Sequence, residues 1–407
     1  MAKPKIRFNG YTEDWEQRKL GDVFEQTSNL VNPKEDEIEL WSLTVEDGLT
    51  KKSDRYNREF LVKKDDNFKE VRPGDIVYNP MNMTLGAVGY NGMTKSVAVS
   101  GYYTTMVAKE NYDTYYINTW LKSPQAIRLY RTYATGSLIE KQRVQFPTLS
   151  IIPVAFPKYE EQTMIGRYFS NLDHLITLHQ RKCEQTKTLK KYMLQKMFPQ
   201  DGEKVPQIRF EGFTEDWEQR KLGELGSLKN GMNFSKEAMG TGFPFVNLQN
   251  IFGNNVIDIT NLGKAMASDS QLKDYNLLKG DVLFVRSSVK LEGVGEAALV
   301  PQNLENTTYS GFIIRFRDEY GLDNNFKRFI FGIESVRNQI MSQATNSANK
   351  NISQTVLENL CLKIPNKSEQ EKIGLYFSNI DHLITLHQRK CDELKEVKKF
   401  MLQNMFV

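Results

Sequence analysis

Two segments of the chain carry apolar or small side chains at alternating spacings of four and three residues. They cover residues 158–198 and 366–406, and each contains one glycine and no proline. The repeating positions are Ile165, Phe169, Leu172, Ile176, His179, Cys183, Thr186, Lys190, Met193 and Met197 in the first segment, and Ile373, Phe377, Ile380, Ile384, His387, Cys391, Leu394, Lys398, Met401 and Met405 in the second. A mean period of about 3.5 residues is typical of a coiled-coil seam. The pattern therefore predicts two long helices that pack on each other.

Each predicted helix covers about 35–40 residues, or roughly 50–60 Å at 1.5 Å per residue. Lysine takes a seam position at the same place in both helices, at Lys190 and Lys398. A polar seam residue can fix the register of a helix pair at some cost in stability. We expect antiparallel packing, which would place the two flanking domains at opposite ends of the pair, related by a pseudo-twofold axis.

The segments that precede these helices have the pattern of mixed α/β domains. A Gly-Asp pair comes before a run of β-branched and aromatic residues at 74–78, and again at 280–284. Turn residues followed by such a run predict a turn and then a strand. The whole chain is therefore expected to be α+β, with two mixed α/β domains and two long helices packed as an antiparallel coiled coil.

An internal duplication organises the chain. Residues 4–20 and 206–222 are identical at fourteen of 17 positions, and residues 165–183 and 373–391 at seventeen of 19. The material between these blocks shares only scattered features, so each half is a variable domain followed by a shared helix. The expected parts are a first domain at 1–158, a first repeated helix at 159–198, a linker at 199–206, a second domain at 207–366 and a second repeated helix at 367–407.

Composition narrows the class of protein only modestly. Lysine and arginine number 54 against 50 acidic residues, and this net charge of +4 is compatible with nucleic acid without arguing for it. The three cysteines form no CxxC pair and no disulfide framework. No apolar run reaches the roughly 18 residues of a membrane span, and the first residues lack the apolar stretch of a signal peptide. We expect a cytoplasmic protein without a membrane partner.

The sequence lacks the motifs of the enzymes that it might otherwise be. It contains no GxxxxGK[ST], no HExxH, no GxSxG and no double proline, which the Asn-Pro-Pro-aromatic element of an adenine methyltransferase requires. The paired carboxylates of residues 12–15 and 214–217 fit a turn or helix cap with tryptophan in the core better than a catalytic dyad. His174 and His179, like His382 and His387, are five residues apart, which suits packing at a helix pair better than one metal ion. We expect no catalytic and no metal site.

The doubled arrangement resembles the specificity (S) subunit of type I restriction–modification systems, and this resemblance covers essentially the whole chain. Residues 160–166 (EEQTMIG) and 369–374 (EQEKIG) are similar to the EQ..I segment of that family. Residues 345–353 (TNSANKNIS) resemble the loop before the last strand of a recognition domain, and residues 135–139 (TGSLI) a divergent version of it.

The resemblance implies a division of labour. Such a subunit reads a bipartite double-stranded DNA target, with one half-site for each target-recognition domain. Two modification subunits dock on the helices, bind S-adenosylmethionine and methylate an adenine in each half-site. Up to two restriction subunits join them, and use ATP and Mg to translocate DNA before cutting it. This chain would hold no cofactor itself.

The resemblance also places the DNA contacts on loops of the recognition domains, where polar side chains reach base edges and phosphates. The candidates in the first domain are Asn79, Met81, Asn82, Thr84, Tyr102, Tyr103, Thr135, Ser137, Lys141 and Arg143. The candidates in the second domain are Arg286, Ser287, Ser288, Lys290, Ser310, Asn346, Ser347, Asn349, Lys350 and Asn351. The candidate partner-binding positions on the helices are Leu172, Ile176, Tyr192, Ile380, Ile384 and Phe400.

Other functions fit parts of the same pattern. A non-catalytic scaffold of two binding domains that are not directed at DNA would use the same helix pair. An orphan specificity subunit that serves modification alone would have the same sequence features. A self-contained restriction–methylation enzyme would need the catalytic motifs that are missing here.

Overall fold

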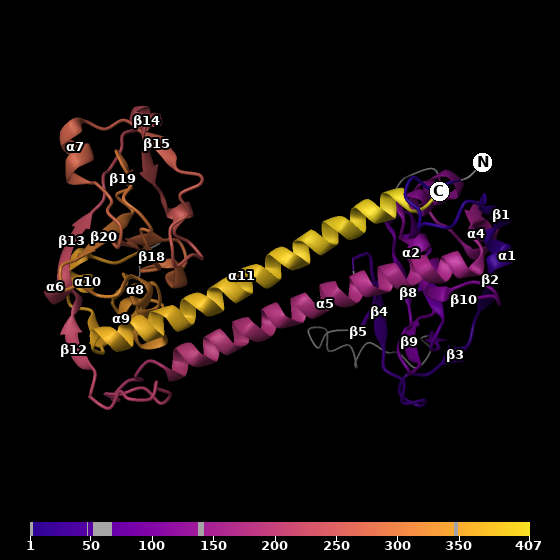
Figure 1. Ribbon diagram of the computed structural model, residues 1–407, viewed down its shortest axis with the longest axis horizontal. Helices are drawn as coiled ribbons and strands as arrows, with labels where there is room; N and C mark the ends of the chain where they lie inside the picture. The colour runs from indigo at the N-terminus through magenta and orange to yellow at the C-terminus, as the bar shows by residue number, and fades with distance from the viewer. Residues whose placement is uncertain (1–2, 47, 52–66, 137–141, 346–348) are drawn as a thin grey trace. The chain divides into compact units, whose positions relative to one another are not determined.

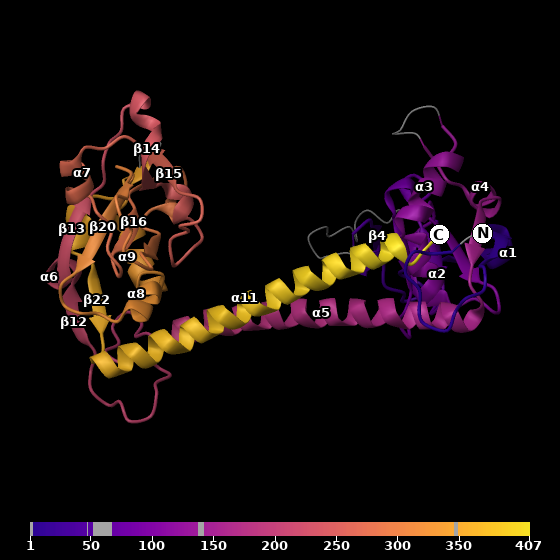
Figure 2. The same ribbon diagram turned by 45° about the horizontal axis from the view of Figure 1, so that its top comes forward.

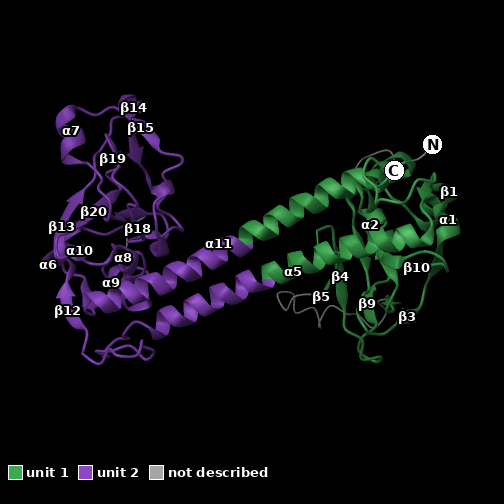
Figure 3. Ribbon diagram, viewed as in Figure 1, with its two compact units in different colours: residues 1–180, 388–407 green, residues 181–387 purple. Residues whose placement is uncertain are grey.

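The computed structural model describes residues 3–46, 48–51, 67–136, 142–345 and 349–407. The chain forms two compact units, each with a sheet-containing domain and parts of both long helices. Unit 1 consists of residues 1–180 and 388–407, and unit 2 of residues 181–387 (Figure 3). Each long helix therefore contributes one part to each unit.

Unit 1 is built on a four-stranded antiparallel sheet with the order β2-β10-β7-β8 (Figure 1). Its strands are β2 (Phe24–Thr27), β7 (Ile76–Tyr78), β8 (Val88–Tyr90) and β10 (Thr104–Ala108). Smaller sheets are formed by β1 (Glu16–Lys19) with β11 (Pro153–Phe156), by β3 (Leu30–Val31) with β6 (Phe68–Val71) and β9 (Val97–Ser100), and by β4 (Trp41–Thr44) with β5 (Gly48–Lys51). The helices of this domain are α1 (Leu20–Val23), α2 (Thr114–Leu121), α3 (Pro124–Tyr133), α4 (Phe146–Ser150) and the short 3-10 helix η2 (Met83–Leu85).

Unit 2 repeats the same central sheet with the order β13-β20-β16-β18, and Figure 2 shows β13, β20 and β16 side by side. These strands are β13 (Gly226–Asn230), β16 (Val282–Val285), β18 (Ala297–Leu299) and β20 (Ile313–Asp318). Smaller sheets are formed by β12 (Glu218–Lys221) with β22 (Cys361–Ile364), by β14 (Met239–Val246) with β15 (Gly263–Ala265) and β19 (Thr308–Tyr309), and by β17 (Ser287–Ser288) with β21 (Lys350–Asn351). The α-helices of this domain are α6 (Leu222–Leu225), α7 (Asp269–Asp274), α8 (Asn324–Ile330), α9 (Glu334–Gln343) and α10 (Gln354–Glu358), and the 3-10 helices are η4 (Lys236–Ala238), η5 (Leu248–Asn250) and η6 (Leu291–Gly293).

The predicted turn-then-strand pattern is confirmed in both units. Gly74 and Gly280 adopt positive φ angles of +91° and +92°, where a Cβ would be strained. The following aspartates accept backbone hydrogen bonds that close the turn, from Arg72 to Asp75 at 2.9 Å and from Leu278 to Asp281 at 2.8 Å. The strands that follow, β7 and β16, are fully buried and form the centre of each sheet.

The two long helices are α5 (Tyr159–Lys196) and α11 (Lys367–Asn404), close to the predicted bounds. Within unit 1 the ring of Phe169 stacks on Phe406, with centroids 5.7 Å apart. Within unit 2 the ring of Phe377 stacks on Phe198 at 6.0 Å. In each unit an early residue of one helix meets a residue just past the end of the other, so the helices are antiparallel as predicted.

Burial along the helices follows the predicted seam. All ten seam positions of each helix are buried or half-buried. The seam lysines pair with aspartates of the opposite helix, Lys190 with Asp381 at 2.6 Å in unit 2 and Lys398 with Asp173 in unit 1. Since each lysine has a specific partner, a shift of one helix along the other would break both ion pairs.

The repeated N-terminal block ties each domain to the helix pair. In unit 1, Arg7 forms a two-pronged ion pair with Glu161 at the start of α5, at 2.6 and 2.7 Å. The backbone of the preceding residue, Ile6, donates to Asn404 O at the end of α11. In unit 2, Arg209 pairs with Glu369 in the same way, at 2.8 Å for both contacts, and Ile208 N donates to Lys196 O.

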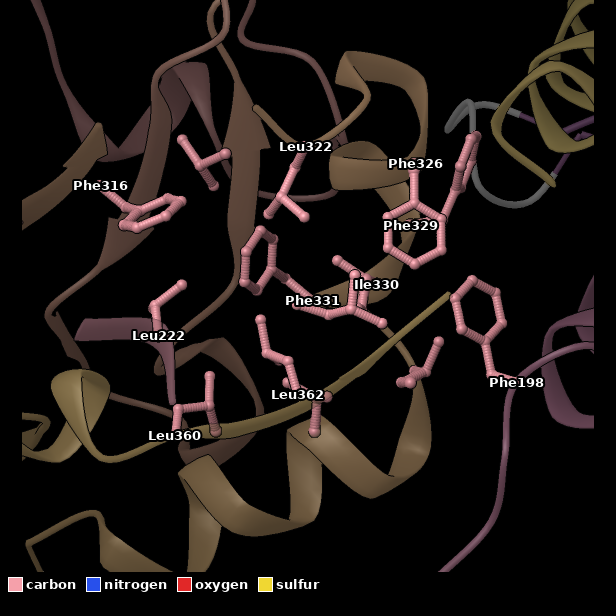
Figure 4. Close-up of a cluster of buried hydrophobic side chains, with 14 of the residues drawn as sticks. Phe198, Leu222, Phe316, Leu322, Phe326, Phe329, Ile330, Phe331, Leu360 and Leu362 are labelled. Carbon is pink, nitrogen blue, oxygen red and sulfur yellow. The ribbon is translucent and has the colours of Figure 1, made fainter. Parts of the chain in front are cut away.

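A phenylalanine just after each long helix, Phe198 or Phe406, is buried in the core of a domain. Figure 4 shows Phe198 among the buried side chains of unit 2, where its ring lies 5.7 Å from Phe326 and 5.9 Å from Trp217. Phe406 has the same place in the core of unit 1, 5.6 Å from Tyr116. The repeated tryptophans are buried as predicted. Each block before them contains a bend, at Glu13 and Glu215, and leads into strand β1 or β12 rather than into a helix.

Candidate nucleic-acid interface

In unit 2, three predicted loops meet at one end of the central sheet. Strand β16 ends where β20 begins, with Val285 opposite Ile313, and both residues are fully buried. The next residue, Arg286, donates its backbone N–H to Phe312 O at 2.7 Å and accepts from Ile352 N at 2.9 Å. The sheet therefore brings together segments around residues 286, 312 and 351, which are distant in the sequence.

Beyond Arg286 the chain forms a small two-stranded ribbon. Strand β17 pairs with β21, so that Ser287 lies opposite Asn351 and Ser288 opposite Lys350. All four residues are half-buried, and the neighbouring Lys290 is exposed. The ribbon thus collects hydroxyl, amide and ammonium groups, which are the groups that bind base edges and phosphates.

Unit 1 builds an equivalent edge. Strand β7 ends at Tyr78, which lies opposite Thr104 at the start of β10. Pro80 O accepts a hydrogen bond from Val144 N at 3.0 Å, as Arg286 O does from Ile352 N. Thr135 and Arg143 exchange two backbone hydrogen bonds at 3.0 and 2.9 Å beside this contact. We call the segments around residues 78–80, 102–104 and 143–144 the β7 edge of unit 1. We call the segments around residues 286–288, 310–312 and 350–352 the β16 edge of unit 2.

The remaining candidates differ in how far they are available to a partner. Asn79 accepts a hydrogen bond from Met81 N at 3.0 Å in a local turn, and the Met81 side chain is exposed. Thr84 and Ser310 are buried, so their side chains pack inside the loops and are not available to DNA. The other first-domain candidates are the exposed Asn82, Tyr102, Thr135 and Arg143 and the half-buried Tyr103. Asn349 is exposed beside the β16 edge, whereas Ser137, Lys141, Asn346 and Ser347 lie outside the described residues.

One exposed residue at the β16 edge was missed by the sequence-based selection. Phe312 has the same position in its turn as Tyr102 has in unit 1, and its side chain is 58 % exposed. The available signal was the repeated Ser-Gly-aromatic sequence, at residues 100–102 and 310–312. Only a comparison of strand register between the two sheets makes the two aromatic residues equivalent.

Comparison with known proteins places this architecture in a family. The model of the type I restriction modification DNA specificity domain matches twice, at residues 12–188 and 214–396, and so covers most of the chain. The chain belongs to the type I specificity subunit family. It is 22 % identical to the type I restriction enzyme MjaVIII specificity subunit of Methanocaldococcus jannaschii, over 95 % of this chain and 91 % of the relative. It is 28 % identical to the EcoKI specificity subunit of Escherichia coli over 37 % of this chain and 32 % of that protein.

Solved structures show the same fold. The type I restriction–modification S subunit from M. genitalium aligns with a TM-score of 0.60 at 16 % identity, over 100 % of this chain and 99 % of that one. A chain from a structural study of complex assembly and conformational transition in the type I system aligns with a TM-score of 0.53 at 15 % identity, over 96 % and 97 % of the two chains. Its membership of the specificity-subunit family, which the family model shows, makes this chain a recognition component of a restriction–modification system and not one of its catalytic subunits.

The helices of this specificity subunit present several exposed large apolar side chains outside the seam, among them Leu175 and Leu189 on α5 and Leu375 and Leu386 on α11. Of the six candidate partner-binding residues, Leu172, Ile176 and Ile380 are buried and Ile384 is half-buried, because they are seam residues. Tyr192 and Phe400 are 50 % and 55 % exposed. These two aromatic residues have equivalent positions in the repeated helices, so the outer surface of α5 carries the same feature as that of α11.

The packing interpretation fits the helix cysteines but only two of the four helix histidines, because His174 and His382 are exposed. His179 and His387 are half-buried on the seam, and Cys183 and Cys391 are buried in it. Across the described residues, no three His, Cys, Asp or Glu side chains are arranged to hold a metal ion. None of the helices within the described part of the chain is long and apolar enough to cross a membrane.

Proposed function

We propose that this specificity subunit reads a bipartite double-stranded DNA target, with the β7 edge on one half-site and the β16 edge on the other. The observation that carries the proposal is the equivalence of the two edges. Each lies at the same end of the same four-stranded sheet, and each is closed by the same backbone hydrogen bond, from Val144 to Pro80 or from Ile352 to Arg286. Two equivalent edges with different side chains suit two different half-sites.

The side chains of the β16 edge are suited to both kinds of DNA contact. Amide groups such as Asn351 pair with adenine edges in the major groove, and arginine with guanine. Lys350 and Lys290 carry charges that bind phosphates and position the protein without reading sequence. In this proposal residues 1–158 and 207–366 are the two recognition domains, residues 199–206 link the halves, and residues 159–198 and 367–407 are the scaffold.

The repeated helices supply the docking surface for the enzymatic subunits. Tyr192 and Phe400 are exposed aromatic residues at equivalent positions, so two copies of one partner can dock in the same way. Exposed aromatic residues are favoured at the centres of protein interfaces. We assign them to two modification subunits, which bind S-adenosylmethionine and methylate adenine. Up to two restriction subunits complete the system with ATP and Mg, and this chain holds no cofactor.

A methylation map tests the proposal. The chain is expressed with its cognate modification subunit in a host without adenine methylation, and the genome is sequenced for modified adenines. We expect one split motif, with half-sites about one helical turn, or roughly 10 base pairs, apart between their centres. Replacement of Ser287 and Asn351 by alanine should change one half of that motif and leave the other half intact.

Two outcomes would refute this function. An assembled, folded complex that modifies no adenine would favour a scaffold that is not directed at DNA. A motif whose two halves both change with the Ser287→Ala, Asn351→Ala double variant would mean that the two edges do not read separate half-sites. Addition of the cognate restriction subunit then shows whether the same motif directs cleavage or modification alone.

A further inference from the structure

The same four-residue turn projects an aromatic ring at both edges. The turns comprise residues 100–103 and 310–313. In each, the backbone N–H of the fourth residue donates to the carbonyl of the first, at 3.0 and 2.9 Å. The serine hydroxyl that begins each turn accepts from the N–H of the aromatic residue, at 3.4 and 3.3 Å. We call these the aromatic turns, and their rings are Tyr102, 47 % exposed, and Phe312, 58 % exposed.

Close packing underneath explains the glycine in each aromatic turn. A Cβ on Gly101 would lie 2.3 Å from Asn67 O, and one on Gly311 would lie 2.1 Å from Asn233 Oδ1. Both distances are far shorter than a real carbon–oxygen contact. At Gly101 the blocking atom belongs to the backbone, so only glycine fits, whereas at Gly311 the Asn233 side chain would have to move. The turn is pressed against the domain at its second residue, and its third residue therefore stands at the surface.

A cationic side chain holds each aromatic turn from the side. Lys69 Nζ donates to Tyr103 O at 2.7 Å, and Arg286 Nη1 donates to Gly311 O at 3.4 Å. Burial lowers the pKa of Lys69, in keeping with its place inside the edge. Thr104, which follows the first turn, and Ile313, the last residue of the second turn, are buried in the first positions of β10 and β20. Each ring is thus exposed on a rigid support.

The recurrence of the exposed ring, more than its exposure, points to an apolar partner. A single exposed apolar side chain is ordinary on a protein surface. Here the same class of side chain recurs at the same turn in two domains whose other edge residues differ. Its neighbours at the β16 edge, such as Ser287 and Asn351, are polar. The apolar surfaces that DNA offers are the faces of its bases and the thymine methyl group.

We propose that Tyr102 and Phe312 each contact a base of one half-site through the ring, and so contribute to specificity in both domains. This proposal rests on the proposed function and assigns a role that the polar side chains cannot fill. Phenylalanine has no charge and no hydrogen-bonding group, so Phe312 cannot bind a phosphate in the way that Lys350 can. A preorganised ring also loses little side-chain entropy when it binds.

The test compares Phe312→Ala with Tyr320→Ala in the complex of this chain with its modification subunit. Tyr320 is a matched control, because it is 47 % exposed and follows the opposite end of β20. Equilibrium binding to a duplex with the mapped target is measured over a range of salt concentrations. We expect Phe312→Ala to weaken binding on the order of ten-fold or more, and Tyr320→Ala to leave it unchanged.

Salt dependence separates a base contact from a phosphate contact. Loss of one phosphate contact reduces the slope of log K against log salt by about 0.9. We expect this reduction for Lys350→Ala and an unchanged slope for Phe312→Ala. In the methylation map, Phe312→Ala should relax one position in one half-site, and Tyr102→Ala one position in the other.

If folded Phe312→Ala binds with wild-type affinity and gives an unchanged motif, the inference is overturned. The proposed function would still stand in that case, provided that the wild-type chain gives a split motif. A wild-type complex without any split motif would instead refute the proposed function itself. Phe312→Leu guards against a folding defect, because it keeps an apolar side chain of similar length without the ring. We expect Phe312→Leu to retain the unfolding midpoint of the wild type and to lose affinity, and full affinity in this variant would also contradict a ring–base contact.

Discussion

The ion pair between Arg209 and Glu369 allows a quantitative test of how the repeated block holds unit 2 together. Two contacts of 2.8 Å join the guanidinium to the carboxylate at the start of α11. The Glu369 side chain is 0 % exposed and that of Arg209 is largely buried. The hydrogen bond with Glu369 raises the pKa of Arg209, so the cation is present at any pH at which the protein folds.

Replacement of Arg209 by alanine should destabilise unit 2 by about 3–5 kcal/mol, because it leaves the buried Glu369 carboxylate without its cation. The paired variant Arg209→Met, Glu369→Leu should cost much less, since both charges leave the interior together and the apolar side chains fill similar space. The assay is urea unfolding followed by circular dichroism, with the transition of each unit fitted separately. Arg7→Ala is the matched variant in unit 1, where Arg7 pairs with the equally buried Glu161.

The exposed pair of Lys204 and Asp216 provides the control. These side chains lie 3.1 Å apart in unit 2 but are mostly exposed, so Lys204→Ala should cost less than about 1 kcal/mol. If Arg209→Ala cost no more than Lys204→Ala, the buried ion pair would not hold the repeated block to the helix. If the Met/Leu variant were as unstable as Arg209→Ala, the loss would come from altered packing and not from an unpaired charge.

Three further predictions concern residues at equivalent positions in the two units. Burial raises the pKa of Asp75 above its ordinary value, so the folded state binds a proton more tightly than the unfolded state, and wild-type stability falls as pH rises from about 4 through the folded pKa. Asp75→Asn should therefore be as stable as the wild type near pH 3 and more stable at pH 7. Asp281→Asn should instead destabilise the protein at pH 7, because Arg317 loses its carboxylate partner at 2.6 Å. Both variants are measured by thermal unfolding, and a loss of stability in Asp75→Asn at pH 7 would contradict the argument. Tyr192→Asp together with Phe400→Asp should abolish co-purification of the modification subunit with little change in the unfolding midpoint, and retained co-purification would move the docking surface elsewhere. Asn351→Ala should cost about 1–3 kcal/mol of discrimination at one base pair of one half-site, measured by competition between duplexes, and equal losses in both half-sites would argue against separate edges.

The helical scaffold could be predicted from the sequence in detail because its structure depends on local periodicity. Phe169 and Cys183 belong to a series of positions that are spaced four or three residues apart on one face, so their burial follows from the period alone. The lysine in each seam was predicted to fix the register, but the sequence did not identify Asp381 or Asp173 as the partner of that lysine. That assignment depends on the antiparallel register, which only the packed helices define.

The edges could be predicted only as a set of loops. Residues 286–288 and 350–351 meet because β16, β20 and the loop before α10 come together in three dimensions, and pairing across such distances has no local pattern in the sequence. For the same reason the sequence did not separate the buried Thr84 and Ser310 from exposed candidates. Phe312 was missed because single exposed phenylalanines are common, and only its equivalence to Tyr102 makes it distinctive.

The repeated blocks are nearly identical in the two halves whereas the edges differ, because the blocks make more contacts with the rest of the fold than the edge side chains do. Each identical block contacts more than one element: the block around Arg7 bonds to the start of α5 and to the end of α11, and the block around Arg209 bonds to the start of α11 and to the end of α5. A change at such a position must be accommodated by two helices and a domain at once. The side chains of the edges project from a sheet whose strand ends are already closed by backbone hydrogen bonds, such as Ile352 to Arg286. Since those bonds do not depend on the side chains that carry the recognition groups, one scaffold can support two edges with different residues, and therefore two different half-sites.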